Sequence, residues 1–246
     1  MNTYIVGSNN GLGKYLNEKI TSVGINRSNF HLIKPNPDNI FIVCAKHSKK
    51  YPSSVEIDAF YEDNIKLVEN LCEIQHKQII FMSTVEVYSQ NHSDENTEIT
   101  SEELNPYAIS KLIAENIIAN KAEDYVILRL GALLGPYSNN LVCRVLNDIS
   151  SQTTLDKDST FNYVLYEDVL KFLRIIIDGE YHGIFNLVSN NNVKLEDALR
   201  LIDKKVKYGS YTYKTIKVVN EKVNNITRIF NKKSEQSLQT FMIDLK

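Results

Sequence analysis

The clearest chemical signal in the sequence is a tyrosine followed one helical turn later by a lysine. Tyr107 and Lys111 lie in the run Asn-Pro-Tyr-Ala-Ile-Ser-Lys at 105–111. Pro106 fits the first turn of a helix, and the i,i+4 spacing puts both side chains on one face. An ammonium group one turn from a phenol stabilises the phenolate and lowers the phenol pKa. Tyr107 could then exchange a proton with a carbinol or carbonyl oxygen near neutral pH.

A glycine-rich loop near the N-terminus predicts a binding site for a pyrophosphate. It follows the β-branched and aromatic run 3–6, and apolar residues at helical spacing come after it. Backbone N–H groups and the helix dipole converge at such a strand-to-helix turn. The spacing is GxxxGxG rather than GxGxxG, so a purely structural tight turn is the alternative. The loop consists of Gly7, Ser8, Asn9, Asn10, Gly11, Leu12 and Gly13.

The turn after the predicted second strand bears on the choice of cofactor. Asn26, Arg27 and Ser28 follow the short run 23–25. Folds selective for NAD usually place a carboxylate there, whereas a nearby arginine accommodates the 2′-phosphate of NADP. The turn therefore favours NADP over NAD, and the alternative is a surface arginine in a turn.

Two hydroxyl groups end another apolar strand. Ser83 and Thr84 follow the run predicted as a strand over 78–82. Ligands bind outside the carboxyl ends of strands in open α/β sheets, so a hydroxyl at that edge can hydrogen-bond a reacting oxygen.

The wider pattern alternates apolar strands with amphipathic helices. We expect strands over 3–6, 23–25, 40–43, 78–82 and 125–130, with helices after Gly11, over about 60–74 and after Pro106. This alternation predicts an α/β fold, a Rossmann-like doubly wound parallel sheet covered on both faces. Beyond Pro136 we expect helices near 141–149, 167–177 and from 194, and a strand over 183–188. The predicted domains are 1–136, which binds a dinucleotide, and 137–246, a mixed α/β substrate lobe that partly returns to the main sheet.

Composition excludes several classes of protein. The chain has 246 residues, 43% of them hydrophobic and 24% charged, with a net charge of −2. Disordered, collagen-like and nucleic-acid-coating proteins do not fit this balance. No apolar window approaches the roughly 18 residues of a membrane span. No basic segment precedes an apolar core near the N-terminus, so we expect no signal segment. We expect a soluble, cytoplasmic protein with no membrane or nucleic-acid partner. The three cysteines and five histidines show no metal-ligand spacing, so no metal is expected.

Basic residues concentrate near the C-terminus. Residues 201–246 carry ten Lys or Arg and four Asp or Glu, a charge of +6, which leaves −8 for the rest of the chain. Either this stretch is a solvated basic face, or it attracts a phosphorylated substrate.

In chain order, the glycine loop, the hydroxyl-bearing strand end and the YxxxK pair resemble the short-chain dehydrogenase/reductase superfamily. Within it the sequence is similar to the extended branch of nucleotide-sugar epimerases, dehydratases and reductases. Thr84 lies four residues before Tyr88 and 23 before Tyr107, which is typical of that branch. Further matches are Ala45, Asn64, the run 129–136, the run 166–169 and Asn186.

The resemblance implies roles for individual residues. Tyr107 would be the acid/base, Lys111 would tune it and bind the nicotinamide ribose, and Thr84 would position the reacting oxygen. Beside the glycine loop, the 26–28 turn, Tyr107 and Lys111, the cofactor-binding residues would be Cys44, Ala45, Lys46, Asn64, Gly131 and Leu133. The superfamily also implies a homodimer built on the YxxxK helix.

Departures from the branch narrow the expected activity. The span between the strands at 23–25 and 40–43 is short, and Val85 stands where sugar dehydratases carry the aspartic acid that expels a hydroxyl. Dehydration is therefore disfavoured, and Glu86 is either the counterpart of the dehydratase glutamate or a strand-end residue. We expect NADP, or NAD, to support hydride transfer on a small-molecule substrate, a nucleotide-linked sugar, with ketoreduction favoured. The alternatives are an epimerase and a non-catalytic NADP-binding protein.

Overall fold

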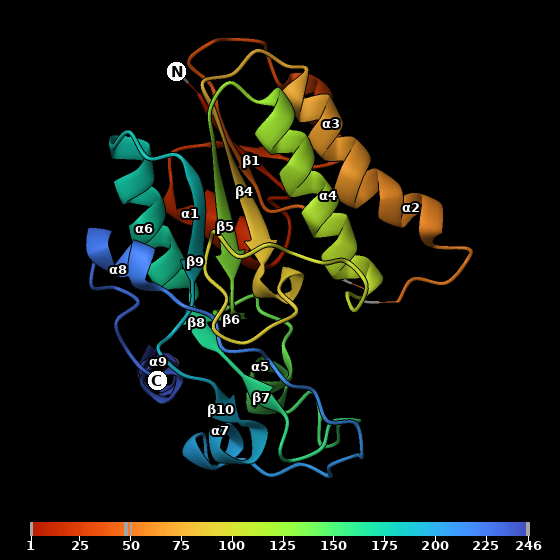
Figure 1. Ribbon diagram of the computed structural model, residues 1–246, viewed down its shortest axis with the longest axis vertical. Coiled ribbons are helices and arrows are strands. Elements are labelled where there is room, and N and C mark those ends of the chain that lie inside the picture. The colour runs from red at the N-terminus through yellow and green to blue at the C-terminus, as the bar shows by residue number, and fades with distance from the viewer. Residues whose placement is uncertain (1, 47–48, 50, 245–246) are drawn as a thin grey trace. The chain divides into compact units, whose positions relative to one another are not determined.

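The chain forms two compact units in the computed structural model, which describes residues 2–46, 49 and 51–244 (Figure 1). The first unit comprises Met1–Ser89, Thr97–Arg129 and Glu180–Phe185, and the second comprises Gln90–Asn96, Leu130–Gly179 and Asn186–Lys246. The sequence predicts a boundary after residue 136, with part of 137–246 returning to the main sheet, and this division into functional domains stays a prediction. The compact units change at 129/130, and 180–185 belongs to the first unit, where strand β9 (Gly183–Leu187) adds to the sheet.

A six-stranded sheet organises the first unit, in the order β2-β1-β3-β4-β5-β9. Parallel pairing joins β2 to β1, β1 to β3 and β3 to β4, with Tyr4 opposite both Val23 and Phe41. All residues of β3 and β4 are buried, which explains their unbroken apolar runs. The strands are β1 (Thr3–Val6), β2 (Val23–Ile25), β3 (Ile40–Val43), β4 (Gln78–Thr84) and β5 (Tyr125–Leu130).

Helices cover both faces of this sheet. The chain moves outward from β1 to β2, and in the opposite direction through β3, β4 and β5, so right-handed crossovers place α1 (Gly11–Lys19) on one face and the later helices on the other. Figure 1 shows α3 (Leu67–Cys72) beside α4 (Pro106–Lys121), and α4 contacts β4. Phe41, Phe81 and Ile118 belong to the core between sheet and helices.

Two local features differ from the sequence-based expectation, and a third, the short span after β2, agrees with it. The helix expected over 60–74 consists of α2 (Ile57–Tyr61), the π-helical turn η2 (Glu62–Lys66) and α3. Strand β4 continues two residues further than predicted and includes Ser83 and Thr84, followed by the 3₁₀ turn η3 (Val85–Val87). The short span after β2 contains only the 3₁₀ turn η1 (Phe30–Leu32).

Short strands and helices surround a separate apolar core in the second unit. Parallel strands β6 (Ala132–Leu134) and β8 (Tyr163–Leu165) form one pair, and antiparallel β7 (Thr160–Phe161) and β10 (Val193–Lys194) form another. Leu134, Tyr163 and Leu238 belong to this core. Within the described ranges, no helix combines the length and apolar character that crossing a membrane requires. The helices of the second unit are α5 (Leu141–Leu146), α6 (Tyr166–Asp178), α7 (Leu195–Leu201), α8 (Glu221–Ile226) and α9 (Ser234–Asp244).

Candidate active site

The glycine loop between β1 and α1 is too tightly packed to accept side chains at two positions. Gly7 has a φ of +91°, and a Cβ there would lie 2.4 Å from the backbone nitrogen of Ala45. A Cβ on Gly13 would lie 2.2 Å from the carbonyl oxygen of Gly7. These contacts bring the start of α1 close to the carboxyl ends of β1 and β3, at the edge where ligands bind in open α/β sheets.

The N-terminus of α1 fits a pyrophosphate. The N–H groups of Gly7 and Ser8 already donate to the carbonyl of Ile25, at 2.8 and 3.2 Å. The first N–H groups of a helix, however, have no partner inside it, and the N-cap residue Asn10 makes no side-chain capping bond. The N–H groups of Gly11, Leu12 and Gly13 therefore have no partner within the helix and no Asn10 side-chain cap, and they lie at the positive end of the helix dipole.

The turn at 26–28 is held by its own side chains. The Asn26 side-chain oxygen accepts hydrogen bonds from the backbone N–H of Ser28 at 2.9 Å and from its hydroxyl at 2.6 Å, and the Asn26 amide donates to Asn9 at 3.4 Å. Arg27 extends into solvent and forms an ion pair with Asp63 of η2. No sequence pattern indicated this partner, which lies 36 residues away.

The end of β4 and the start of α4 are connected through polar side chains. The buried Thr84 hydroxyl accepts a hydrogen bond from the backbone N–H of Glu86 at 3.2 Å and so caps η3. Asn105 donates to a Glu86 carboxylate oxygen at 3.1 Å and accepts from the N–H of Ala108 at 3.0 Å. Asn105 thus caps α4 and fixes its first turn, which carries Tyr107, to the turn that follows Thr84.

Tyr107 and Lys111 are both buried on α4, with exposed fractions of 7% and 1%. The Lys111 ammonium donates to the carbonyl oxygen of Met82 at 3.0 Å and lies 4.4 Å from the centre of the Phe81 ring. The helix therefore anchors its lysine on β4, directly before the residue pair that ends the strand. Thr84, Tyr107 and Lys111 all belong to the first unit.

The expected lowering of the Tyr107 pKa does not occur in this structure. Burial, followed by the negative charge of Glu86, raises the pKa of the Tyr107 phenol above its ordinary value. Burial and the charge of Lys46 lower the pKa of Lys111 from 10.5 to about 7, against the opposing effects of Cys44 and Glu115. Burial and Glu86 thus favour the protonated phenol of Tyr107, and a lysine that loses its charge near neutral pH opposes them little.

The lowered pKa of Lys111 predicts a pH-dependent stability in the absence of cofactor. Between pH 7 and about 10.4 the unfolded chain binds a proton that the folded chain lacks, so the free energy of unfolding rises with pH in this window. One pKa unit corresponds to about 1.4 kcal/mol. We expect Lys111→Met to raise stability at pH 7 by about 1 to 3 kcal/mol and to flatten the rise towards pH 10.

Urea unfolding of both proteins at pH 7, 8 and 9 measures this difference. Lys121→Met is the matched control, since Lys121 lies on the same helix but is half exposed and pairs with Glu73 at 3.1 Å. The control should leave the slope unchanged. A Lys111→Met protein that is less stable at pH 7 and keeps the parental pH slope would contradict the assignment.

The remaining candidate cofactor residues fall into both units. Cys44, Ala45 and Lys46 follow β3, and the N–H groups of Cys44 and Ala45 donate to the carbonyl of Val6 at 2.8 and 2.9 Å. Asn64 is buried on η2. Gly131 and Leu133 belong to the second unit, where the Gly131 N–H donates to the Leu187 carbonyl at 3.1 Å and the Leu133 carbonyl accepts from Ser138 at 2.7 Å.

Sequence reasoning missed a buried charge network one turn beyond Lys111. The guanidinium of Arg129 at the end of β5 donates to Glu115 of α4 at 2.6 Å and to the Tyr88 hydroxyl at 2.7 Å. The hydroxyl of Ser83 donates to the same carboxylate. Burial disfavours the cation, but the hydrogen bonds and charge of Glu115, followed by Tyr88, raise the pKa of Arg129. The i,i+4,i+8 spacing of Tyr107, Lys111 and Glu115 was the signal that could have found it.

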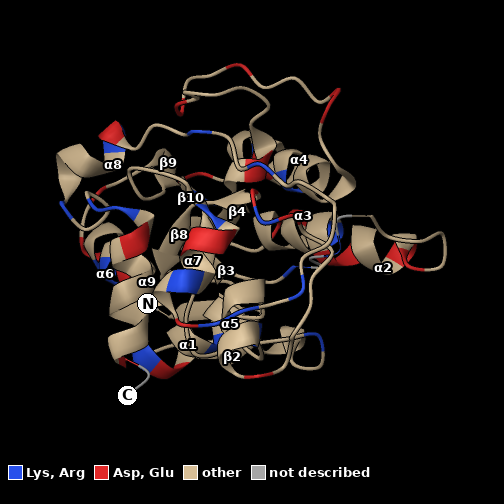
Figure 2. Ribbon diagram, turned by 90° about the horizontal axis from the view of Figure 1, so that it is seen from below, with Lys and Arg blue, Asp and Glu red and all other residues tan. Residues whose placement is uncertain are grey.

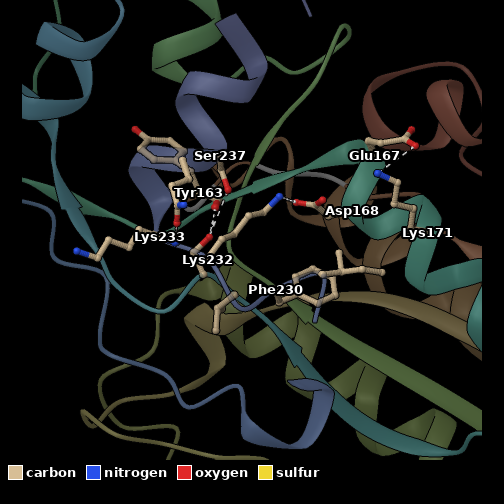
Figure 3. Close-up of polar contacts among 12 residues, drawn as sticks. Tyr163, Glu167, Asp168, Lys171, Phe230, Lys232, Lys233 and Ser237 are labelled. Carbon is tan, nitrogen blue, oxygen red and sulfur yellow. Dashed lines mark hydrogen bonds and ion pairs between the residues drawn. The ribbon is translucent and has the colours of Figure 1, made fainter. Parts of the chain in front are cut away.

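Some of the basic residues near the C-terminus have partners within the second unit. Figure 3 shows Lys232 extended towards Asp168, which is 4% exposed, at a distance of 2.6 Å. Lys204 pairs with Asp148 at 2.6 Å. Acidic and basic residues also lie side by side on α7 in Figure 2, where Arg200 pairs with Asp197 at 3.0 Å. Lys204 and Lys232 therefore contribute to ion pairs within the unit, and attraction of a phosphorylated substrate stays a prediction.

Comparison with solved structures finds the same fold in nucleotide-sugar enzymes. The dTDP-4-dehydrorhamnose reductase of Bacillus anthracis, in complex with NADP, is 19% identical with a TM-score of 0.80, over 99% of this chain and 100% of that chain. The UDP-glucuronic acid 4-epimerase of Bacillus cereus, in complex with UDP-glucuronic acid and NAD, is 15% identical with a TM-score of 0.74, over 100% of both chains. RMD of Pseudomonas aeruginosa, complexed with NADPH, is 16% identical with a TM-score of 0.70, over 99% of this chain and 98% of that chain.

Sequence comparisons gave two results. No curated protein matches the chain. Residues 23–187 match the NAD dependent epimerase/dehydratase family, and this range contains the 26–28 turn, the end of β4 and the YxxxK helix. The glycine loop before it completes the strand–loop–helix unit of a Rossmann-like sheet. Sequence and fold thus agree, and the chain belongs to the NAD dependent epimerase/dehydratase family.

Proposed function

We propose that this protein is an NAD(P)-dependent ketoreductase that acts on a nucleotide-linked sugar. The observation that carries the proposal is the pair of hydrogen bonds that fix α4, with Tyr107 and Lys111, to the end of β4, which carries Thr84. The dTDP-4-dehydrorhamnose reductase with the same fold supports the keto sugar as substrate class.

The glycine loop and the N-terminus of α1 are the residues that would hold the pyrophosphate of the dinucleotide, which supplies or accepts a hydride when bound. The glycines leave room for its close approach, and the free N–H groups of the first turn would bind its charge. Lys111 donates one proton to Met82, and in its charged and its neutral form it keeps at least one more proton that could bind a nicotinamide ribose hydroxyl.

Tyr107 would donate its phenolic proton to the substrate oxygen as the carbonyl is reduced. Its raised pKa keeps the proton in place at neutral pH and makes the phenol an acid in the reductive direction. The Thr84 oxygen accepts from Glu86, which leaves the hydroxyl proton to donate to the same substrate oxygen. Two donors on one oxygen would stabilise the charge that develops there.

Val85 supports reduction over dehydration. It is 4% exposed and follows Thr84 directly, so no acid stands at the place where a dehydratase must protonate a leaving hydroxyl. The next residue, Glu86, has a carboxylate, and this carboxylate accepts the hydrogen bond from Asn105 that fixes α4. General acid catalysis typically contributes about 100- to 10,000-fold, so elimination of water without it is negligible.

An epimerase is the second candidate, because a 4-epimerase with NAD shares the fold. A non-catalytic NADP-binding protein is the third.

Two substrate panels distinguish the three candidate functions. One panel contains nucleotide hexoses, and the other contains their 4-keto derivatives together with NADPH. Absorbance measures NADPH consumption, and mass spectrometry measures the mass of the product. We expect NADPH consumption with a keto derivative. Inversion of a sugar without net NADPH consumption would favour the epimerase, and a product lighter by one water would contradict the assignment.

We also propose a homodimer built on α4. Ile113 is 40% exposed on this helix, although it is apolar, and an interface between two copies of α4 would cover it.

A further inference from the structure

An ion pair connects the turn after β2 with the π-helical turn η2. The Arg27 Nε atom donates to the Asp63 carboxylate at 3.1 Å and an Nη2 proton goes to the same oxygen at 2.5 Å, while Nη2 also contacts the second oxygen. The Arg27 side chain is 79% exposed and that of Asp63 is 18% exposed. Hydrogen bonding and then the charge of Asp63 raise the pKa of Arg27.

Asp63 supplies a carboxylate where the end of β2 has none. A fold selective for NAD places a carboxylate at the ribose hydroxyls, and one selective for NADP places an arginine near the 2′-phosphate. Asn26 occupies the usual carboxylate position, and its side chain is used within its own turn. The structure brings both kinds of group together, with the arginine from the turn after β2 and the carboxylate from η2.

We propose that Asp63 is a specificity-determining residue that acts through Arg27 and weakens the preference for NADP. This inference rests on the proposed function in that the bound molecule is a nicotinamide dinucleotide. A 2′-phosphate carries about −1.5 to −2 charges and must draw the guanidinium away from Asp63 or lie beside its carboxylate. The 2′-hydroxyl of NAD has no charge and can itself donate to that carboxylate. The pair thus reduces the advantage of NADPH without excluding either cofactor.

Asp63→Asn tests the proposal by fluorescence titration with NADPH and NADH. At about 4 Å two unit charges interact by about 1 kcal/mol in water, and a factor of ten corresponds to about 1.4 kcal/mol. We therefore expect NADPH to bind about 3- to 10-fold more tightly to the variant, whereas NADH affinity stays the same or falls. Arg27→Ala should remove most of the discrimination between the two cofactors.

The double variant shows whether Asp63 acts through Arg27. In the Arg27→Ala background, Asp63→Asn should improve NADPH binding by a smaller factor than in the parent. Glu69→Gln is the matched control, because it breaks the partly exposed pair of 3.1 Å between Lys66, the last residue of η2, and Glu69 and should change neither affinity. A thermal unfolding curve of Asp63→Asn that overlaps the parental curve excludes a general structural effect.

The outcomes separate this inference from the function on which it rests. If both cofactors bind but Asp63→Asn changes their affinities equally, changes neither, or weakens NADPH, the inference is overturned and the proposed function stands. An undiminished gain in the Arg27→Ala background would show direct repulsion of the phosphate and would also overturn it. If neither cofactor binds to the parent protein, the proposed function and the inference are both contradicted.

Discussion

Tyr107→Phe is expected to lower turnover by about 100- to 10,000-fold, with cofactor affinity nearly unchanged. The substitution removes one hydroxyl, which is the proposed proton donor, and keeps the ring that fills its buried position. Single-turnover oxidation of NADPH with a reacting keto sugar measures the chemical step, and fluorescence titration measures binding.

Tyr4→Phe is the control for this substitution. Tyr4 is 2% exposed in the same unit, and its hydroxyl accepts a hydrogen bond from the backbone N–H of Lys34 at 3.4 Å, outside the candidate site. Tyr4→Phe removes the same phenolic hydroxyl from a similarly buried ring, so this variant should keep parental turnover. If Tyr107→Phe retains near-parental activity on a confirmed substrate, Tyr107 is not the acid.

The parts of the fold that the sequence predicted correctly are those with long, regular apolar patterns. Strands β1, β2, β3 and β5 have the predicted bounds. For β1, β3 and β5 the reason is that parallel strands buried on both faces read as short unbroken apolar runs. The second unit was harder, since β6, β7, β8 and β10 have only two or three residues and no periodicity. The π turn η2 within the helix expected over 60–74 has no signature in the apolar spacing either.

The candidate site divides in the same way between local and long-range features. The glycine loop, Asn105 and the Tyr107–Lys111 spacing are contiguous, so their types and order were enough to place them on a loop and a helix. The Arg27–Asp63 pair joins residues 36 apart, and the strand order, with β1 between β2 and β3, brings the segments after β2 and β3 together. The raised pKa of Tyr107 also depends on burial and on Glu86, neither of which helix geometry alone reveals.

The buried pair of Glu115 and Arg129 gives the largest expected effect on stability. Their side chains are only 3% and 4% exposed, and three contacts of 2.6 to 3.2 Å join them. Removing one partner of a buried pair leaves an uncompensated charge and typically costs about 3 to 5 kcal/mol. We therefore expect Glu115→Leu to lower the free energy of unfolding by that amount, as measured by urea denaturation at pH 7.

The double variant Glu115→Leu with Arg129→Leu distinguishes loss of the pair from loss of packing. Replacement of both charges by apolar groups is often close to neutral, so the double variant should recover most of the lost stability. Glu73→Gln is the control, because it breaks the exposed pair between Glu73 and Lys121, which lies on α4 like Glu115. This variant should lower the free energy of unfolding by about 0 to 1 kcal/mol. If the double variant is as unstable as the single one, packing around α4 rather than the charge of Arg129 accounts for the loss. A stable double variant with low turnover would instead indicate that the network positions α4, and with it Tyr107, against the strand end that carries Thr84.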